Sequence, residues 1–303
     1  MKLNRSDRAK LACLYAGIVW GIYWIPLRMM SEAGLSGVWA TVMFYLVPLA
    51  LLLPFMVRRW RHIASGGVAL HLGAVLAGVG LVAYANALIS TEIIYAIVLY
   101  YLTPLWGFLF ARLIVGEAIT PLRWLSVIIG LSGLYVMFGQ ETGLPLPRNM
   151  GDWMGLAGGI FWAAASTTIL VNKQVAWQDF GYTYFFWGTL AALAVAFLPV
   201  DPASSIPDLE MVVGILPWLI PILLVAVIPG CFASMFGASI LNPGIVGLLF
   251  MTEISVGTVT AALWAGEPFG TRELIGVLLI SAAGICEPLV DLIRRSNRTT
   301  EQD

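Results

Sequence analysis

The chain has 303 residues, of which 60% are hydrophobic and only 11% charged, and its formal net charge is −1. A soluble domain carries roughly 25% charged residues, and a soluble protein this poor in charge would expose large apolar patches. The composition therefore excludes a water-soluble globular domain and indicates lipid as the main solvent. The balanced charge also argues against a nucleic-acid partner.

Ten apolar stretches are long enough to cross a bilayer, which requires roughly 20 mostly apolar residues. The first follows a basic N-terminus and remains apolar from Leu11 to Met30. This is longer than the roughly 7–15 residues of a signal-peptide core, so we expect a retained helix. The ten expected spans are 9–30, 37–57, 68–89, 93–115, 121–138, 152–173, 182–199, 212–236, 243–265 and 271–293. The eighth contains Pro217, Pro221 and Pro229 and is predicted to be irregular.

The basic residues predict the orientation of these spans. With the N-terminus inside, only Arg28, Arg148 and Arg272 lie outside, which leaves thirteen of the sixteen Lys and Arg on the cytoplasmic side. The cluster at 294–298 joins the cytoplasmic side only if the number of spans is even. We therefore expect a multi-pass protein of the plasma membrane (the inner membrane of a bacterium) with both termini in the cytoplasm.

Two short matches in the same order predict an internal duplication. Gly17, Ile18 and Trp20 of the first span match Gly159, Ile160 and Trp162 of the sixth, and Val-Gly-Glu at 115–117 matches Ala-Gly-Glu at 265–267. The predicted units are 1–150 and 151–303. Because each has an odd number of spans, the two halves must be inverted, an arrangement typical of secondary transporters with a substrate site near the midplane.

Glu253 lies near the middle of the ninth span. A charge there costs about 2.5–3.5 kcal/mol on insertion scales, so intramembrane carboxylates usually face a cavity or a partner. We expect Glu253 to bind a substrate ammonium group or to take up a proton. The alternative is a hydrogen bond that packs helices together.

Aromatic and polar residues inside the spans suggest what could line such a cavity. Trp20 and Trp162 lie well inside their helices, not at the interfaces where Trp usually anchors a span. An aromatic cavity could stack on rings or hold a cation, although each of these residues could also simply pack between helices. The expected cavity residues are Trp20, Tyr84, Tyr95, Leu99, Tyr101, Trp162, Ser166, Met251, Thr252 and Glu253.

Glu117 and Glu267 are the repeat-related carboxylates near helix ends, and Pro229 belongs to the irregular span. For the two carboxylates we favour a structural role, stabilising the next helix or pairing with an arginine. Arg112 or Arg123 would pair with Glu117, and Arg272 with Glu267. A role as hinges or gates is the alternative, since the pair lies on opposite sides of the membrane.

The Gly-Ile-Val-Trp-Gly opening helix, the Pro104 helix leading into Gly116-Glu117 and the repeated Gly266-Glu267 resemble a known family. They look like the EamA-type members of the drug/metabolite transporter superfamily, and the Trp- and Tyr-rich helices look most like aromatic amino-acid exporters of the YddG type. The resemblance covers the whole chain. It implies ten helices, cytoplasmic termini, a central cavity and export of amino acids or related metabolites.

These observations predict an all-α secondary transporter that exports neutral or aromatic amino acids by alternating access. A broad drug/metabolite exporter is the nearest alternative, and a membrane-embedded enzyme or a channel is disfavoured. We expect no catalytic residues, no metal and no cofactor, since Cys13, Cys231 and Cys286 show no metal-like spacing. The expected partners are a small-molecule substrate and the bilayer, with protons as a candidate coupling ion.

Overall fold

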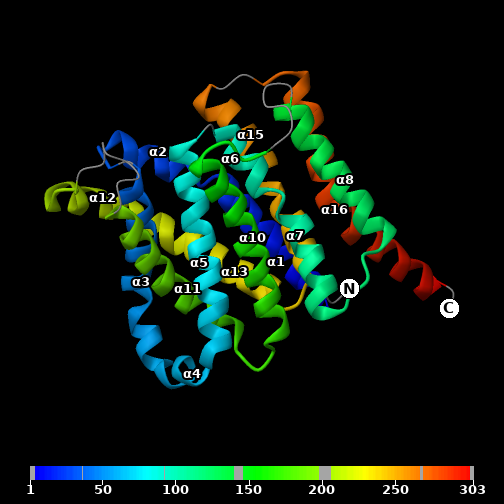
Figure 1. Ribbon diagram of the computed structural model, residues 1–303, viewed down its shortest axis with the longest axis horizontal. Coiled ribbons are helices and arrows are strands. Elements are labelled where there is room, and N and C mark those ends of the chain that lie inside the picture. Colours follow the sequence, from blue (N-terminus) through cyan, green and yellow to red (C-terminus); the bar gives the residue numbers. More distant parts are fainter. Residues whose placement is uncertain are drawn as a thin grey trace.

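The computed structural model describes residues 4–35, 37–91, 93–139, 146–197, 206–266 and 269–300, and within these ranges the regular structure is helical throughout (Figure 1). The first half contains α1 (Arg5–Gly21), α2 (Trp24–Glu32), α3 (Val38–Arg58), α4 (Trp60–Ser65), α5 (Gly67–Ser90), α6 (Ile93–Tyr100), α7 (Thr103–Phe110), the π-helical turn η1 (Ala111–Val115), α8 (Pro121–Leu134) and the π-helical turn η2 (Tyr135–Gly139). The second half contains α10 (Met150–Val171), α11 (Trp177–Ala196), α12 (Leu209–Ile222), the π-helical turn η3 (Leu223–Val227), α13 (Ile228–Ala238), α14 (Pro243–Phe250), α15 (Thr252–Ala265) and α16 (Thr271–Thr300).

Seven segments of the described chain are long and apolar enough to cross a membrane, and the stretch Pro121–Met137 is a shorter apolar helix. The seven are Arg5–Glu32, Val38–Arg58, Gly67–Leu88, Ala96–Val115, Met150–Val171, Leu209–Ala238 and Pro243–Trp264. Of the ten expected spans, the three that contain α8, α11 and α16 are not among these seven. The expectation of a multi-pass helical protein is confirmed, and the count of ten stays a prediction.

Several expected spans are broken rather than continuous. The first divides into α1 and α2, and the fourth divides into α6 and α7. Pro104 is near the start of α7, where its missing N–H prevents the preceding helix from continuing. The eighth is irregular as its prolines predict, since the π-helical turn η3 separates α12 from α13. The ninth divides at Met251 into α14 and α15.

The fourth and ninth segments also end alike. Gly116 follows η1 with φ of 78° and Gly266 follows α15 with φ of 70°. Both adopt the left-handed conformation that ends helices and that glycine enters without steric cost. The two matched Gly-Glu sequences therefore mark equivalent helix ends.

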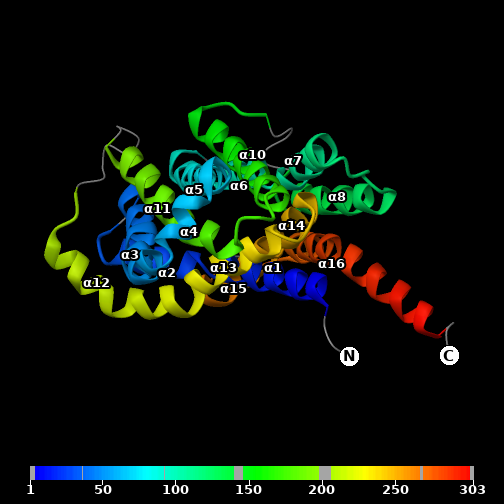
Figure 2. The same cartoon turned by 90° about the horizontal axis from the view of Figure 1, so that it is seen from below.

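The first helix of each half packs into the other half. In the first half α1 lies against α13, α14 and α15, and in the second half α10 lies against α5, α6 and α7 (Figure 2). A methyl group on Gly237 would overlap Cys13, and one on Gly155 would lie 3.6 Å from the Ala87 methyl. When the halves are aligned on their matched motifs, Cys13 corresponds to Gly155 and Ala87 corresponds to Gly237.

A second pair of contacts repeats in the same way. A methyl group on Gly230 would lie 3.0 Å from Val19, and one on Gly80 would lie 3.0 Å from Phe161. Close contact between helices through small residues is typical of membrane bundles. The two halves thus use the same helix–helix contacts.

The remaining helices surround two groups, one formed by α1 with α13, α14 and α15 and the other by α10 with α5, α6 and α7. The helix α11 packs on α3 and α5, and α7 packs on α14. The pair α8 and α16 forms one flank of the molecule, as Figures 1 and 2 show. The ends N and C lie on the same side in Figure 1. Large apolar side chains such as Leu113 and Val225 are exposed, as expected for a surface that faces lipid.

Candidate functional site

The breaks between α6 and α7 and between α14 and α15 face the first helix of the opposite half. Thr103 and Thr252 follow the two breaks, and each hydroxyl donates to the carbonyl three residues earlier, on Tyr100 and Leu249. Gly159 of α10 approaches Thr103, and Gly17 of α1 approaches Thr252. The same glycine–threonine contact thus occurs at both breaks.

Glu253 is the first charged residue after the second break, and its side chain is half-buried. The hydroxyls of Tyr84, Tyr100 and Tyr101 lie near its carboxyl group. Tyr101 is the nearest to a hydrogen bond with Glu253, although its buried hydroxyl makes no hydrogen bond of ordinary geometry. The carboxyl group of one half therefore lies near tyrosines of the other.

The tyrosines form a compact aromatic group. The rings of Tyr84 and Tyr100 stack with centroids 3.9 Å apart, and Tyr101 meets Tyr100 edge to face at 5.2 Å. On the second half Trp162 stacks on Phe250 with centroids 5.6 Å apart. Both halves therefore contribute aromatic rings close to the two breaks, and that these rings line a cavity stays a prediction.

Three donors in this part of the molecule lack a hydrogen-bond acceptor. They are the Tyr101 hydroxyl and the indole N–H groups of Trp106 and Trp162, all buried. Buried polar groups are nearly always paired, so unpaired ones call for an explanation such as a ligand or water. A carboxylate together with unpaired donors suits a ligand that carries both a cationic group and a hydrogen-bond acceptor.

The other expected cavity residues are placed as follows. Ser166 is buried and donates to the Trp162 carbonyl, so its hydroxyl is satisfied within its own helix. Leu99 and Met251 are buried at the two breaks. The side chain of Tyr95 lies outside the described residues. That these residues line a cavity stays a prediction.

Trp20 is partly buried and contacts the second half. Its indole N–H donates to the Ser234 hydroxyl of α13 at 3.5 Å, and its ring meets Tyr23 and Phe44. Ser234 in turn donates to the Gly230 carbonyl. Pro229 is the second residue of α13, which begins directly after η3, so it lies where the eighth segment changes helix type.

Glu117 pairs with Arg123 at 3.1 Å, one of the two expected partners. Glu117 also accepts a hydrogen bond from the Asn242 side chain at 2.6 Å, a contact between the halves that the sequence did not indicate. Glu267 lies outside the described residues. Its expected partner Arg272 donates to the Val136 and Met137 carbonyls within η2.

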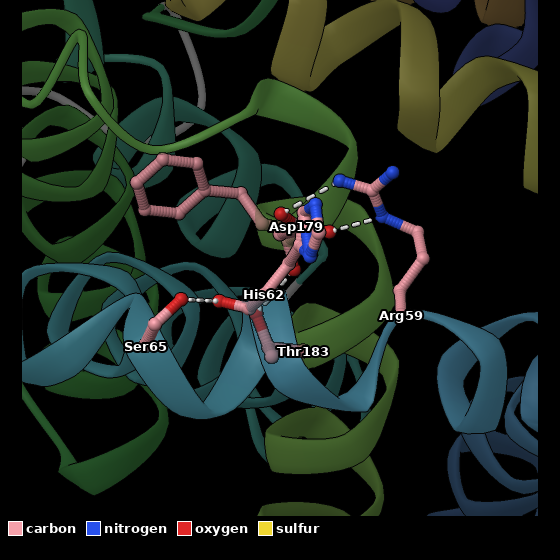
Figure 3. Close-up of polar contacts among 6 residues, drawn as sticks. Arg59, His62, Ser65, Asp179 and Thr183 are labelled. Carbon is pink, nitrogen blue, oxygen red and sulfur yellow. Dashed lines mark hydrogen bonds and ion pairs between the residues drawn. The ribbon is translucent and has the colours of Figure 1, made fainter.

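A second polar contact between the halves was also missed from the sequence. Arg59 donates to both carboxylate oxygens of Asp179, at 2.6 and 3.0 Å, where α3 ends and α11 begins (Figure 3). The hydrogen bond to Asp179 raises the pKa of Arg59 above its ordinary value, so the guanidinium stays charged at physiological pH. Deeper between the same helices, the Tyr45 and Tyr184 hydroxyls are 2.9 Å apart.

Comparison with known proteins agrees with this architecture. Solved structures are similar in fold: one crystal structure aligns with a TM-score of 0.67 at 17% identity, covering 93% of this chain and 96% of that one. At this identity the likeness shows the fold alone. No curated protein sequence is significantly similar to the chain. Residues 8–139, most of the first half, match the profile of the EamA-like transporter family, a family of membrane transporters.

Proposed function

We propose that this protein is a secondary transporter that exports neutral amino acids, aromatic ones among them, across the plasma membrane. Both termini are cytoplasmic, in accordance with the basic residues. The substrate binds between the halves, close to the two helix breaks. The observation that carries the proposal is Glu253, a carboxylate held inside the bundle opposite three tyrosines.

The chemistry of this site suits an amino acid. The Glu253 carboxylate would bind the ammonium group, since a charge-assisted hydrogen bond is about twice as strong as a neutral one. The free donors of Tyr101 and Trp162 would bind the carboxylate of the substrate. Aromatic rings supply the surface for an apolar or aromatic side chain.

Transport would proceed by alternating access of two inverted five-helix repeats, 1–150 and 151–303. The repeated contacts Gly237–Cys13 and Gly155–Ala87, and those of Gly230 and Gly80, support duplication. Equivalent broken helices support a site at the centre, because interrupted helices in corresponding positions are the usual mark of transporter binding sites. The driving force is the substrate gradient or a proton gradient.

Reconstitution into liposomes tests this proposal. Purified protein is incorporated, and uptake of a radiolabelled panel of amino acids is followed with and without an imposed pH gradient. We expect saturable flux of at least one neutral amino acid above that of empty liposomes. No flux for any amino acid would refute the proposal. Flux only of unrelated amphipathic cations would favour the alternative, a broad drug/metabolite exporter.

A further inference from the structure

The two sides of the molecule are not equally closed. On the side where the chain begins, α7 packs directly on α14: methyl groups on Gly107 and Gly247 would lie 2.6 Å from the Gly244 nitrogen and 3.1 Å from the Pro104 backbone. The repeat-equivalent contact on the opposite side would join α6 to α15. Within the described residues these two helices are not closely packed.

A second pair of contacts differs in the same sense. The helices α5 and α11 meet with almost no side chain between them, since a methyl group on Gly78, near the middle of α5, would lie 2.8 Å from the Gly188 nitrogen of α11. The equivalent contact, between α3 and the eighth segment, is made through large side chains such as Phe44 and Leu219. The structure is therefore closed on the N-terminal side and more open on the other.

The side chains of Glu117 and Asn242 join the halves at the closed end. Asn242 donates through its amide to Glu117 at 2.6 Å and accepts through its carbonyl from Gly244 N at 2.9 Å. Arg123 donates to the same Glu117 oxygen at 3.1 Å. Arg123 also lies over the Phe108 ring, on which Gly244 packs.

Three properties suit the Glu117–Asn242 hydrogen bond to hold the two halves together. The bond crosses between the halves, because Glu117 follows the fourth segment and Asn242 begins the ninth. Asn242 is only 5% exposed, so water competes weakly for its amide. The acceptor is a carboxylate, and hydrogen bonds to charged groups contribute more than neutral ones.

We propose that the Glu117–Asn242 bond is a clasp that holds the cytoplasmic end of the transporter shut and must open before the inward-facing state can form. The inference rests on the two-state mechanism proposed above but not on the identity of the substrate. Asn242→Asp would place two carboxylates together while keeping the acceptor for Gly244 N. The double variant Glu117→Gln/Asn242→Asp reverses donor and acceptor and restores the bond.

Distances between spin labels test the clasp without any substrate. In a variant whose three cysteines are replaced by alanine, one label pair is placed at Arg8 and Leu113 on the N-terminal side. The other is placed at Met150 and Leu209 on the opposite side. All four residues are exposed. Arg8 belongs to α1 and Leu113 to η1, whereas Met150 belongs to α10 and Leu209 to α12.

We expect Asn242→Asp to lengthen the first distance and shorten the second, with the ratio of open to closed molecules rising roughly tenfold. The double variant should return both distributions to those of the parent. Unchanged distances in Asn242→Asp would overturn the proposal, as would a shift that the double variant does not reverse. If Asn242→Asp does not fold, Glu117→Ala, which removes the acceptor, should give the same shift, and its failure to do so would equally overturn it.

The two proposals fail in different ways. Amino-acid flux with unchanged distances would support the proposed function and refute the clasp. Shifted distances without amino-acid flux would support the clasp and refute amino acids as the substrate.

Discussion

Replacing Arg59 by glutamine should destabilise the protein more than replacing Asp179 by asparagine, although both changes remove the same ion pair. The two side chains differ in exposure: 33% for Arg59 and 4% for Asp179. Removing the arginine leaves a nearly buried carboxylate without its partner. Removing the carboxylate leaves a guanidinium that reaches water at the helix end.

The magnitudes follow from these exposures. Breaking a fully buried pair costs about 3–5 kcal/mol, and because water reaches Arg59 we discount this to roughly 2–3 kcal/mol for Arg59→Gln. Asp179→Asn keeps an acceptor and leaves a solvated cation, so its cost should be close to that of a surface pair, about 1 kcal/mol or less. Arg59→Lys should fall between them, because lysine keeps the charge but loses the two-pronged geometry.

Thermal unfolding of the purified protein in detergent measures this order. We expect the midpoint to fall most for Arg59→Gln, less for Arg59→Lys and least for Asp179→Asn. The double variant Arg59→Gln/Asp179→Asn should be more stable than Arg59→Gln alone, because the buried charge is gone. A midpoint for Asp179→Asn as low as that of Arg59→Gln would refute the reasoning from burial.

Three further predictions concern packing and the site. Gly159→Ala places a methyl group 2.5 Å from the Tyr100 carbonyl and should cost about 1–3 kcal/mol of stability. The matched control is Gly214→Ala, whose methyl group meets nothing within 4 Å. Equal thermal midpoints for the two variants would contradict the close packing at Gly159. Gly188→Ala overlaps the Tyr45 ring and should lower the midpoint too, whereas an unchanged midpoint would mean that this helix pair is loosely packed. Trp162→Phe keeps a ring against Phe250 and removes an indole N–H that has no partner. Stability should therefore be retained while amino-acid affinity falls about three- to tenfold. Unchanged affinity in a transport assay would show that the indole does not bind the substrate.

The sequence predicted those features that follow from composition and spacing. The multi-pass helical fold follows from apolar runs, and the irregular eighth segment follows from its prolines. The matched Gly-Ile-x-Trp and Gly-Glu sequences marked positions with similar surroundings, since Gly17 and Gly159 each approach a threonine and Gly116 and Gly266 each end a helix with positive φ. A short motif was informative here because each glycine has a steric reason.

Contacts between helices far apart in the chain could not be predicted in this way. Asp179 and Asn242 lie at helix starts, and nothing local marks them as partners of Arg59 and Glu117. Pro104 predicted a kink in the fourth segment, where α6 and α7 are separate. The break at Met251 was missed, because no proline lies beside it. The orientation of Glu253 toward the tyrosines depends on the same tertiary arrangement.

Uptake of a neutral amino acid by proteoliposomes containing the parent protein or Glu253→Gln tests the central claim most directly. Glutamine keeps the size of the side chain and its hydrogen-bonding oxygen but not the charge that binds an ammonium group. Loss of one charge-assisted hydrogen bond should raise the substrate concentration for half-maximal uptake by about tenfold to hundredfold. We predict this loss in a variant that inserts and purifies as the parent does. Equal affinity and rate for the two proteins would contradict the assignment of Glu253 as the substrate-binding carboxylate.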